Sequence, residues 1–113
     1  MSLRQDRVAD QIRDALALLF ATEEVSDPRL SGITITAVKV TPDLQLASVY
    51  YRVLDNEEET KKGAQKGFES CSGFLRKILG DSLDLRRVPV LRFFFDESIE
   101  RGAKIEKLLD DLD

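Results

Sequence analysis

The order in which helical and strand periodicity alternate constrains the fold of this chain most. Apolar residues first recur every three to four positions, then alternate with polar ones, and then return to helical spacing. This order predicts one α+β domain over residues 1–113, with a three-stranded sheet packed against helices. The predicted elements are a helix over 4–21, strands over 33–40 and 44–54, a helix over 55–79 ending at Gly80, a strand over 85–96 and a helix over 98–112.

The strand patterns carry more specific expectations. The apolar phase of 33–40 shifts by one residue near Ala37, which predicts a bulge or a change of twist. In "RFFF" (92–95), alternation and a two-layer domain predict that Phe93 and Phe95 enter the core, and leave the place of Phe94 open. The inward face of the second strand is predicted to consist of Ala47, Val49, Tyr51 and Val53.

The residue inventory argues against catalysis. The chain contains no histidine and one cysteine. The commonest general base and the commonest metal ligand are therefore absent, and the carboxylates are scattered over predicted helix surfaces. We expect no enzyme activity, no catalytic residue, no metal and no cofactor.

The same inventory bears on location. No apolar run approaches the roughly 20 residues that span a bilayer. The charged N-terminal segment lacks the apolar centre of a signal peptide. A single cysteine fits a reducing compartment. We therefore expect a cytoplasmic protein that has no contact with a membrane.

Charge is unevenly distributed along the chain. The net charge is −4, but residues 61–95 carry eight basic and three acidic side chains. The segments on either side, 1–60 and 96–113, are both acidic. A run of charge is often only a solvated face, so the basic middle is a moderate indication of an anionic partner.

The long helix sorts its residues into two stripes. At 100° per residue, one stripe is apolar and must face the sheet: Ala64, Phe68, Cys71, Leu75 and Ile78. The opposite stripe is basic at its ends and small in its middle: Lys62, Lys66, Ser70, Gly73 and Lys77. Small residues allow another backbone to come close, and the flanking lysines supply charge for phosphates.

Ser72 and Gly73 interrupt this helix with weak helix formers. An exposed glycine costs roughly 1 kcal/mol relative to alanine and gains no packing. We therefore expect the helix to bend here and to meet RNA at the bend. Cys71 lies on the apolar stripe, where a free cysteine packs as a small hydrophobe, and no histidine is available to activate it.

Several segments together resemble one known family. "RVADQI" (7–12), "DPRL" (27–30), "TPDLQLASVYYRVL" (41–54), "SGFLRKILG" (72–80) and "LRRVPVLRFFFDESIERGAKIEKLL" (85–109) resemble ribosome-binding factor A, in order and over nearly the whole chain. The resemblance implies a type II KH-like domain. In this family a helix-kink-helix with an Ala-x-Gly motif replaces the usual Gly-x-x-Gly loop. Here the kink motif reads Cys71-Ser72-Gly73.

The resemblance also implies a function. It points to an assembly factor that binds the free small (30S) ribosomal subunit, assists 16S rRNA maturation including the 5′ end, and supports growth in the cold. We expect a monomer that takes no small-molecule substrate and contacts 16S rRNA and ribosomal proteins. The expected RNA-binding residues are Lys62, Lys66, Ser70, Ser72, Gly73, Arg76, Lys77, Arg86 and Arg87.

An alternative stays open at this point. The acidic terminal helices are also typical of a protein-interaction module that binds a basic ribosomal protein. The family's members often carry a longer basic C-terminal tail, whereas this sequence ends in an acidic segment.

Overall fold

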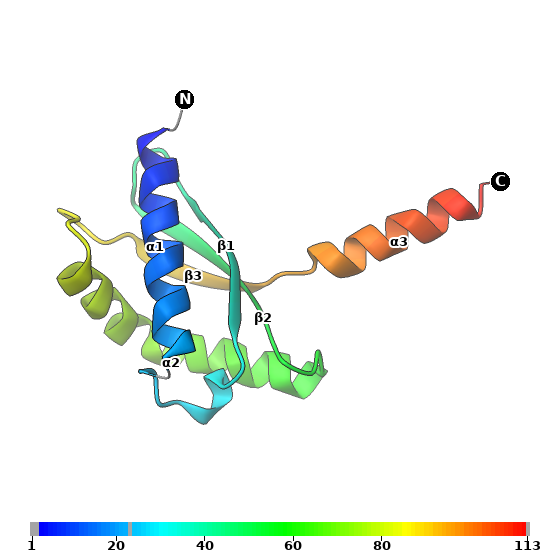
Figure 1. Ribbon diagram of the computed structural model, residues 1–113, viewed down its shortest axis with the longest axis horizontal. Helices are drawn as coiled ribbons and strands as arrows, with labels where there is room; N and C mark the ends of the chain where they lie inside the picture. The colour runs from blue at the N-terminus through cyan, green and yellow to red at the C-terminus, as the bar shows by residue number, and fades with distance from the viewer. Residues whose placement is uncertain (1–2, 23, 113) are drawn as a thin grey trace.

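The computed structural model describes residues 3–22 and 24–112. The predicted order of elements is confirmed (Figure 1). The last strand is shorter than predicted, because 85–89 form an irregular segment that leads into it. The elements are α1 (Arg4–Ala21), a short 3-10 helix η1 (Pro28–Leu30), β1 (Thr34–Val40), β2 (Leu46–Arg52), α2 (Glu58–Ser82), β3 (Val90–Phe95) and α3 (Ser98–Asp110).

The predicted end of the long helix at Gly80 is wrong. α2 continues to Ser82, and the backbone N–H of Leu83 donates to the carbonyl of Leu79 at 2.9 Å. Gly80 does not adopt the left-handed conformation that makes glycine a helix terminator. A Cβ at Gly80 would lie 3.4 Å from Cγ2 of Val88, an ordinary van der Waals contact, so packing here does not require a glycine.

The sheet has the order β1-β2-β3. β1 and β2 pair antiparallel, whereas β2 and β3 pair in parallel, with α2 as the crossover between them. The register of β1 against β2 shifts between Ile35 and Ala37, which confirms the predicted irregularity near Ala37.

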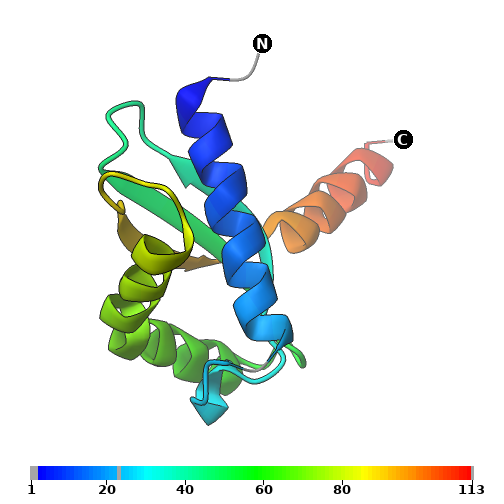
Figure 2. The same ribbon diagram turned by 60° about the vertical axis from the view of Figure 1, so that its left-hand side comes forward.

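One face of the sheet, covered by α1 and α2, forms the core (Figures 1 and 2). The prediction for the inward side of the second strand is confirmed, since Ala47, Val49, Tyr51 and Val53 are all buried. Ile12 and Leu16 of α1 are buried as well. Phe68 of α2 stacks on Phe93 of β3, with ring centroids 4.4 Å apart and planes at 13°. Apolar burial on this side is the main force holding the two layers together.

The three phenylalanines of β3 divide as alternation requires. Phe93 is buried and Phe95 is half-buried against the core, as predicted. Phe94 points to the other face of the sheet and is 44% exposed. The structure thus decides the one position that the sequence pattern left open.

The expected helix-kink-helix is present as one continuous helix that bends. The backbone of α2 is helical from Glu58 to Ser82, and Figures 1 and 2 show it changing direction near its middle. Ser72 Oγ donates to the carbonyl of Glu69 at 3.3 Å. A serine bonded back to the preceding turn favours a bend, because it competes for a carbonyl of the helical ladder.

α3 extends away from the two-layer body (Figure 1). Its first turn is held by Arg52, whose Nη1 donates to the carbonyl of Asp96 and whose Nη2 donates to Oε1 of Glu100, both at 2.6 Å. This guanidinium lowers the pKa of Glu100 to about 2. Residues 101–112 are all exposed, including the apolar Ile105, Leu108 and Leu109.

Candidate nucleic-acid interface

The predicted stripe on α2 is an open, basic ridge. We use "lysine ridge" for Lys62, Lys66, Ser70, Gly73 and Lys77, all of which are exposed. The opposite side of the helix carries the fully buried Ala64, Phe68 and Leu75, so the ridge faces away from the core. Within residues 3–22 and 24–112, none of the three lysines forms an ion pair. Their charge is therefore available to phosphates.

Gly67 and Gly73 of α2 differ in the space around them. A Cβ at Gly73 would meet nothing within 4 Å, so this position opens onto solvent in the middle of the lysine ridge. A Cβ at Gly67 would lie 3.0 Å from Cδ2 of Leu30, because η1 packs tightly there. Gly67 thus serves a contact inside the protein, while Gly73 leaves room for something outside it.

The three residues of the kink motif face different surroundings. Cys71 is half-buried against the core, and burial is the main cause that raises the pKa of its thiol. This placement agrees with packing and disfavours a reactive thiolate. Ser72 is half-buried and lines a hollow of about 330 Å³ between α2 and β3, together with Gln65, Glu69, Leu91, Arg92, Phe93 and Phe94.

Arg76 has a structural bond. Its Nη2 donates to the carbonyl of Val88 at 3.0 Å, which ties α2 to the segment before β3. The side chain is exposed, so the rest of the guanidinium still faces solvent. A phosphate contact from Arg76 remains a prediction.

Arg86 and Arg87 lie apart from the start of the lysine ridge. They sit in the segment after α2, at the opposite end of that helix from Lys62 (Figures 1 and 2). There they line a hollow of about 930 Å³ with residues of α1 and of the β1–β2 turn. We use "arginine hollow" for the surface formed by Arg4, Arg7, Val8, Gln11, Asp43, Leu44, Gln45, Asp84, Leu85, Arg86 and Arg87.

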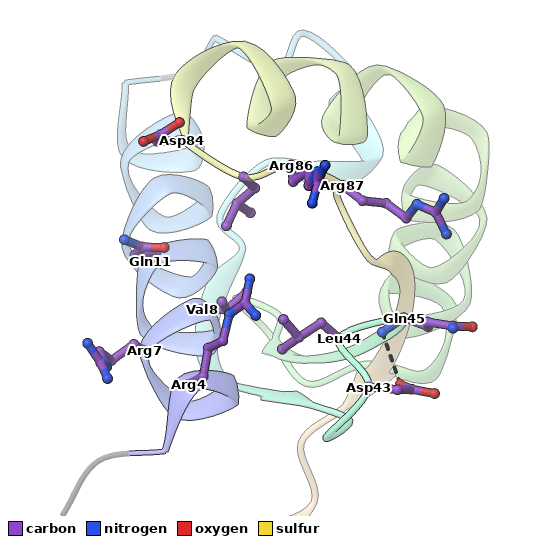
Figure 3. A pocket seen from close by; sticks show the side chains of 11 residues that line it. Arg4, Arg7, Val8, Gln11, Asp43, Leu44, Gln45, Asp84, Arg86 and Arg87 are labelled. Atoms are coloured by element: carbon purple, nitrogen blue, oxygen red, sulfur yellow. Dashed lines mark hydrogen bonds between the residues drawn. The ribbon is translucent and has the colours of Figure 1, made fainter.

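Figure 3 shows how these side chains lie. Arg4 reaches from α1 toward the centre of the hollow, and Arg86 and Arg87 come from the opposite rim. Arg7 and Gln45 point outward on either side. Among the described residues, none of the four arginines forms an ion pair.

Packing on both sides holds the rim that carries Arg86 and Arg87. Leu85 and Val88 pack against the core and Pro89 is fully buried, which leaves the two arginines exposed between these anchors. The backbone N–H of Val90 donates to the carbonyl of Gln45 at 2.9 Å and joins this segment to the β1–β2 turn. The guanidinium groups are therefore presented from a supported backbone.

The β1–β2 turn forms the other wall of the hollow. Leu44 has φ of 62°, a left-handed conformation that leucine rarely adopts. Asp43 Oδ1 accepts hydrogen bonds from Thr41 Oγ1 at 2.7 Å and from the N–H of Gln45 at 3.1 Å, which lowers its pKa. The hollow thus combines four arginines with two carboxylates, Asp43 and Asp84, and keeps a positive balance.

Sequence reasoning missed Arg4 and Arg7. They belong to an acidic N-terminal segment, and only the packing of α1 beside the 83–89 segment brings Arg4 opposite Arg86 and Arg87. Their spacing of three residues on a predicted helix was the available signal, but it does not identify a partner. Among the described residues, no group of three or more acidic, cysteine or histidine side chains is arranged to hold a metal ion.

Topology and surface together define a class. Helix-strand-strand-helix-strand order, a three-stranded mixed sheet and a bent, basic crossover helix are those of a KH-like α+β domain. None of the helices within 3–22 and 24–112 is long and apolar enough to cross a bilayer.

Comparison with known proteins then gives the family. The model of the family "Ribosome-binding factor A" matches residues 4–109. Ribosome-binding factor A of Coxiella burnetii is 47% identical over 110 residues, which cover 97% of this chain and 90% of the relative. The protein of the same name from Staphylococcus saprophyticus is 42% identical over 112 residues, covering 99% and 96%. The chain belongs to the ribosome-binding factor A family.

Solved structures agree. The crystal structure of ribosome-binding factor A from Thermus thermophilus superposes with a TM-score of 0.69 at 30% identity, covering 80% of this chain and 93% of the other. A Thermus thermophilus homology model fitted into a cryo-EM map of a 30S complex gives a TM-score of 0.65 at 29% identity, covering 79% and 91%. This protein is thus a ribosome-binding factor by family and by fold.

Proposed function

We propose that this protein binds the free small ribosomal subunit and assists maturation of 16S rRNA, including its 5′ end, without catalysing a reaction. The observation that carries the proposal is the lysine ridge, with three exposed lysines that lack ion-pair partners among the described residues and with open space at Gly73. The Thermus thermophilus relative fitted into a 30S complex supports the choice of partner.

The mechanism follows from the charges. The lysines would neutralise rRNA phosphates, and the bend at Ser72 and Gly73 would let the RNA backbone approach the helix closely. Arg86 and Arg87 would contact phosphates from the arginine hollow. Binding of this kind holds an rRNA segment in an immature arrangement until later assembly steps displace the protein. It would take place in the cytoplasm and matter most in the cold, where rRNA rearrangement is slow.

Sedimentation of a cell lysate tests this function. We expect the protein to migrate with free small subunits and to be absent from translating ribosomes. The variant Lys66→Glu/Lys77→Glu should move to the top of the gradient, whereas Lys104→Glu/Lys107→Glu on α3 should still migrate with the subunits. Equal sedimentation of both variants with the subunits would argue against the lysine ridge.

A second candidate function rests on α3. This helix extends from the body, residues 101–112 are exposed, and 96–113 carry a net charge of −4. Such a helix also fits a module that binds a basic ribosomal protein. Pull-down with small-subunit proteins freed of rRNA separates the two functions, because RNA binding would be lost there and protein binding would survive.

A further inference from the structure

The face of the sheet that α1 and α2 leave open carries two neighbouring aromatic rings. Tyr50 of β2 and Phe94 of β3 are register partners, with ring centroids 5.7 Å apart and planes at 32°. Phe94 is 44% exposed, and Tyr50 is half-buried. Because alternation places these side chains opposite the core, they do not contribute to the packing of the two layers.

Basic side chains border the two rings. Lys39 Nζ lies 5.7 Å from the centroid of Tyr50, and Lys39 is the register partner of Ser48 on β2. Ser48 is also the partner of the exposed Arg92, so Lys39 and Arg92 lie on the same face, one on each side of β2. Among the described residues, neither forms an ion pair.

Carboxylates also border this face: Glu69 lines the hollow that contains Arg92 and Phe94, and Asp96 and Glu97 line the hollow that contains Lys39 and Tyr50. Asp96 Oδ2 accepts from Thr36 Oγ1 at 2.6 Å, and its Oδ1 accepts from the N–H of Ser98 at 2.9 Å. Glu97 pairs with Arg101 at 3.3 Å. Of the charged groups beside the rings, Lys39 and Arg92 form no ion pair among the described residues, so both can contact the phosphates that flank a stacked base.

We propose that this open face binds unpaired RNA bases, which stack on Tyr50 and Phe94 while Lys39 and Arg92 contact the adjoining phosphates. Aromatic rings on an exposed sheet combined with flanking cations suit single-stranded RNA, because every base offers a flat face for stacking. The inference rests on the proposed function in requiring RNA as the partner. It concerns a surface separate from the lysine ridge and the arginine hollow.

The protein's own last helix is a poor occupant of this face. Arg52 bonds to both Asp96 and Glu100 and directs α3 away from the body. A second copy of the chain would bring the same cations against each other, which costs binding free energy. Unpaired RNA, in contrast, can stack its bases on the rings and place its phosphates beside the cations.

Fluorescence of a ten-nucleotide oligouridylate with 2-aminopurine at its centre tests the proposal, because stacking on an aromatic ring quenches the probe. We expect the wild type to quench it and Phe94→Ala to lose the quenching and at least fivefold in affinity. Phe94→Trp should restore both. Leu18→Ala, which removes another exposed apolar side chain, on α1, should behave as wild type.

Two further measurements keep the outcome decisive. Irradiating the wild-type complex with a 5-bromouridine oligonucleotide should crosslink Tyr50 or Phe94, which settles the matter even if Phe94→Ala does not fold. Crosslinks confined to α2, or unchanged quenching by a folded Phe94→Ala, would overturn the proposal. So would a wild-type dimer in sedimentation velocity that Phe94→Ala dissociates.

Failure of this inference can be told from failure of the proposed function. A wild type that binds small subunits but does not quench the oligonucleotide overturns only the stacking face. A wild type that binds neither overturns both. Lys66→Glu/Lys77→Glu should weaken oligonucleotide binding yet leave full quenching at saturation, since it does not touch the rings.

Discussion

The lysine ridge and the arginine hollow are both basic, but they are built differently. The ridge comes from one helix, whose 3.6-residue period alone aligns Lys62, Lys66 and Lys77. The hollow comes from three segments, and Arg4 is more than 80 residues from Arg86. A surface on one helix survives as long as the helix does, whereas a surface from three segments exists only when the whole domain is packed.

The chemistry of the two surfaces also differs. Lysine is a flexible point charge, and the small Ser70 and Gly73 between the lysines leave the backbone accessible. Arginine presents a planar fork that suits bidentate contacts with phosphate or with guanine. The ridge is therefore suited to following an RNA backbone, and the hollow to holding one RNA feature in a defined orientation.

The largest expected effect comes from reversing charge on the ridge. Lys66→Glu/Lys77→Glu should lower affinity for free small subunits about 100-fold and flatten the dependence of log Kd on log salt, because two phosphate contacts are lost. Both positions are exposed, so the melting temperature should stay within a few degrees of the wild type. Binding of unchanged strength by the folded variant would remove the ridge from the interface.

A smaller effect is expected at the hollow. Arg86→Ala/Arg87→Ala should lower subunit affinity about tenfold. Adding Arg4→Ala to this double variant should lower affinity by less than Arg4→Ala does in the wild type, because the three arginines would act on one RNA feature. The effects of Arg86→Ala/Arg87→Ala and of Lys66→Ala on subunit affinity should be additive, since the two sites are far apart. Strict additivity of Arg4 with Arg86 and Arg87 would show that the three arginines do not act on one RNA feature.

Gly73→Ala should separate stability from binding. Alanine removes the helix penalty of glycine, and its Cβ meets nothing within 4 Å, so the protein should gain up to about 1 kcal/mol in unfolding free energy. The added methyl group points into the space proposed for RNA, and subunit affinity should fall about threefold. Chemical denaturation and sedimentation measure the two quantities.

Cys71→Ala is the matched control for Gly73→Ala. It restores the alanine of the family's motif at a half-buried position beside the core. Subunit binding should remain at the wild-type level. Loss of binding by a folded Cys71→Ala would instead make the cysteine a functional group.

The smallest effect is expected outside both surfaces, at the base of α3. The pKa of Glu100 lies at about 2, below its ordinary value, so the stabilisation from Arg52 is fully present above pH 4.5 and is lost as the pH falls toward 2. NMR titration of the Glu100 carboxyl should give this low midpoint, and Arg52→Gln should raise it toward the ordinary value, because the hydrogen bond from Arg52 is the largest cause of the shift. A wild-type midpoint near the ordinary value would contradict the ion pair between Arg52 and Glu100. Neither Arg52→Gln nor Glu100→Gln should change subunit affinity at neutral pH.

Local periodicity was sufficient to predict the elements and one of the surfaces. Apolar spacing located α1, the bulge near Ala37, the inward residues of β2 and the lysine ridge, because each is a property of a single helix or strand. The phase of alternation likewise put Phe93 in the core. The end of α2 was misplaced because Gly80 does not take the left-handed conformation that ends a helix, and the helix continues to Ser82.

Long-range packing decided what periodicity does not encode. The parallel pairing of β2 with β3 makes register partners of Tyr50 and Phe94, and the docking of α1 brings Arg4 to the arginine hollow. Gly67 and Gly73 look alike in sequence, yet only Gly67 is pressed against Leu30, because η1 packs at that turn. The elements and their apolar faces follow from local sequence, because they depend on neighbours two to four residues away. Which distant side chains share a surface depends on how the elements pack, and this is visible only in the folded structure.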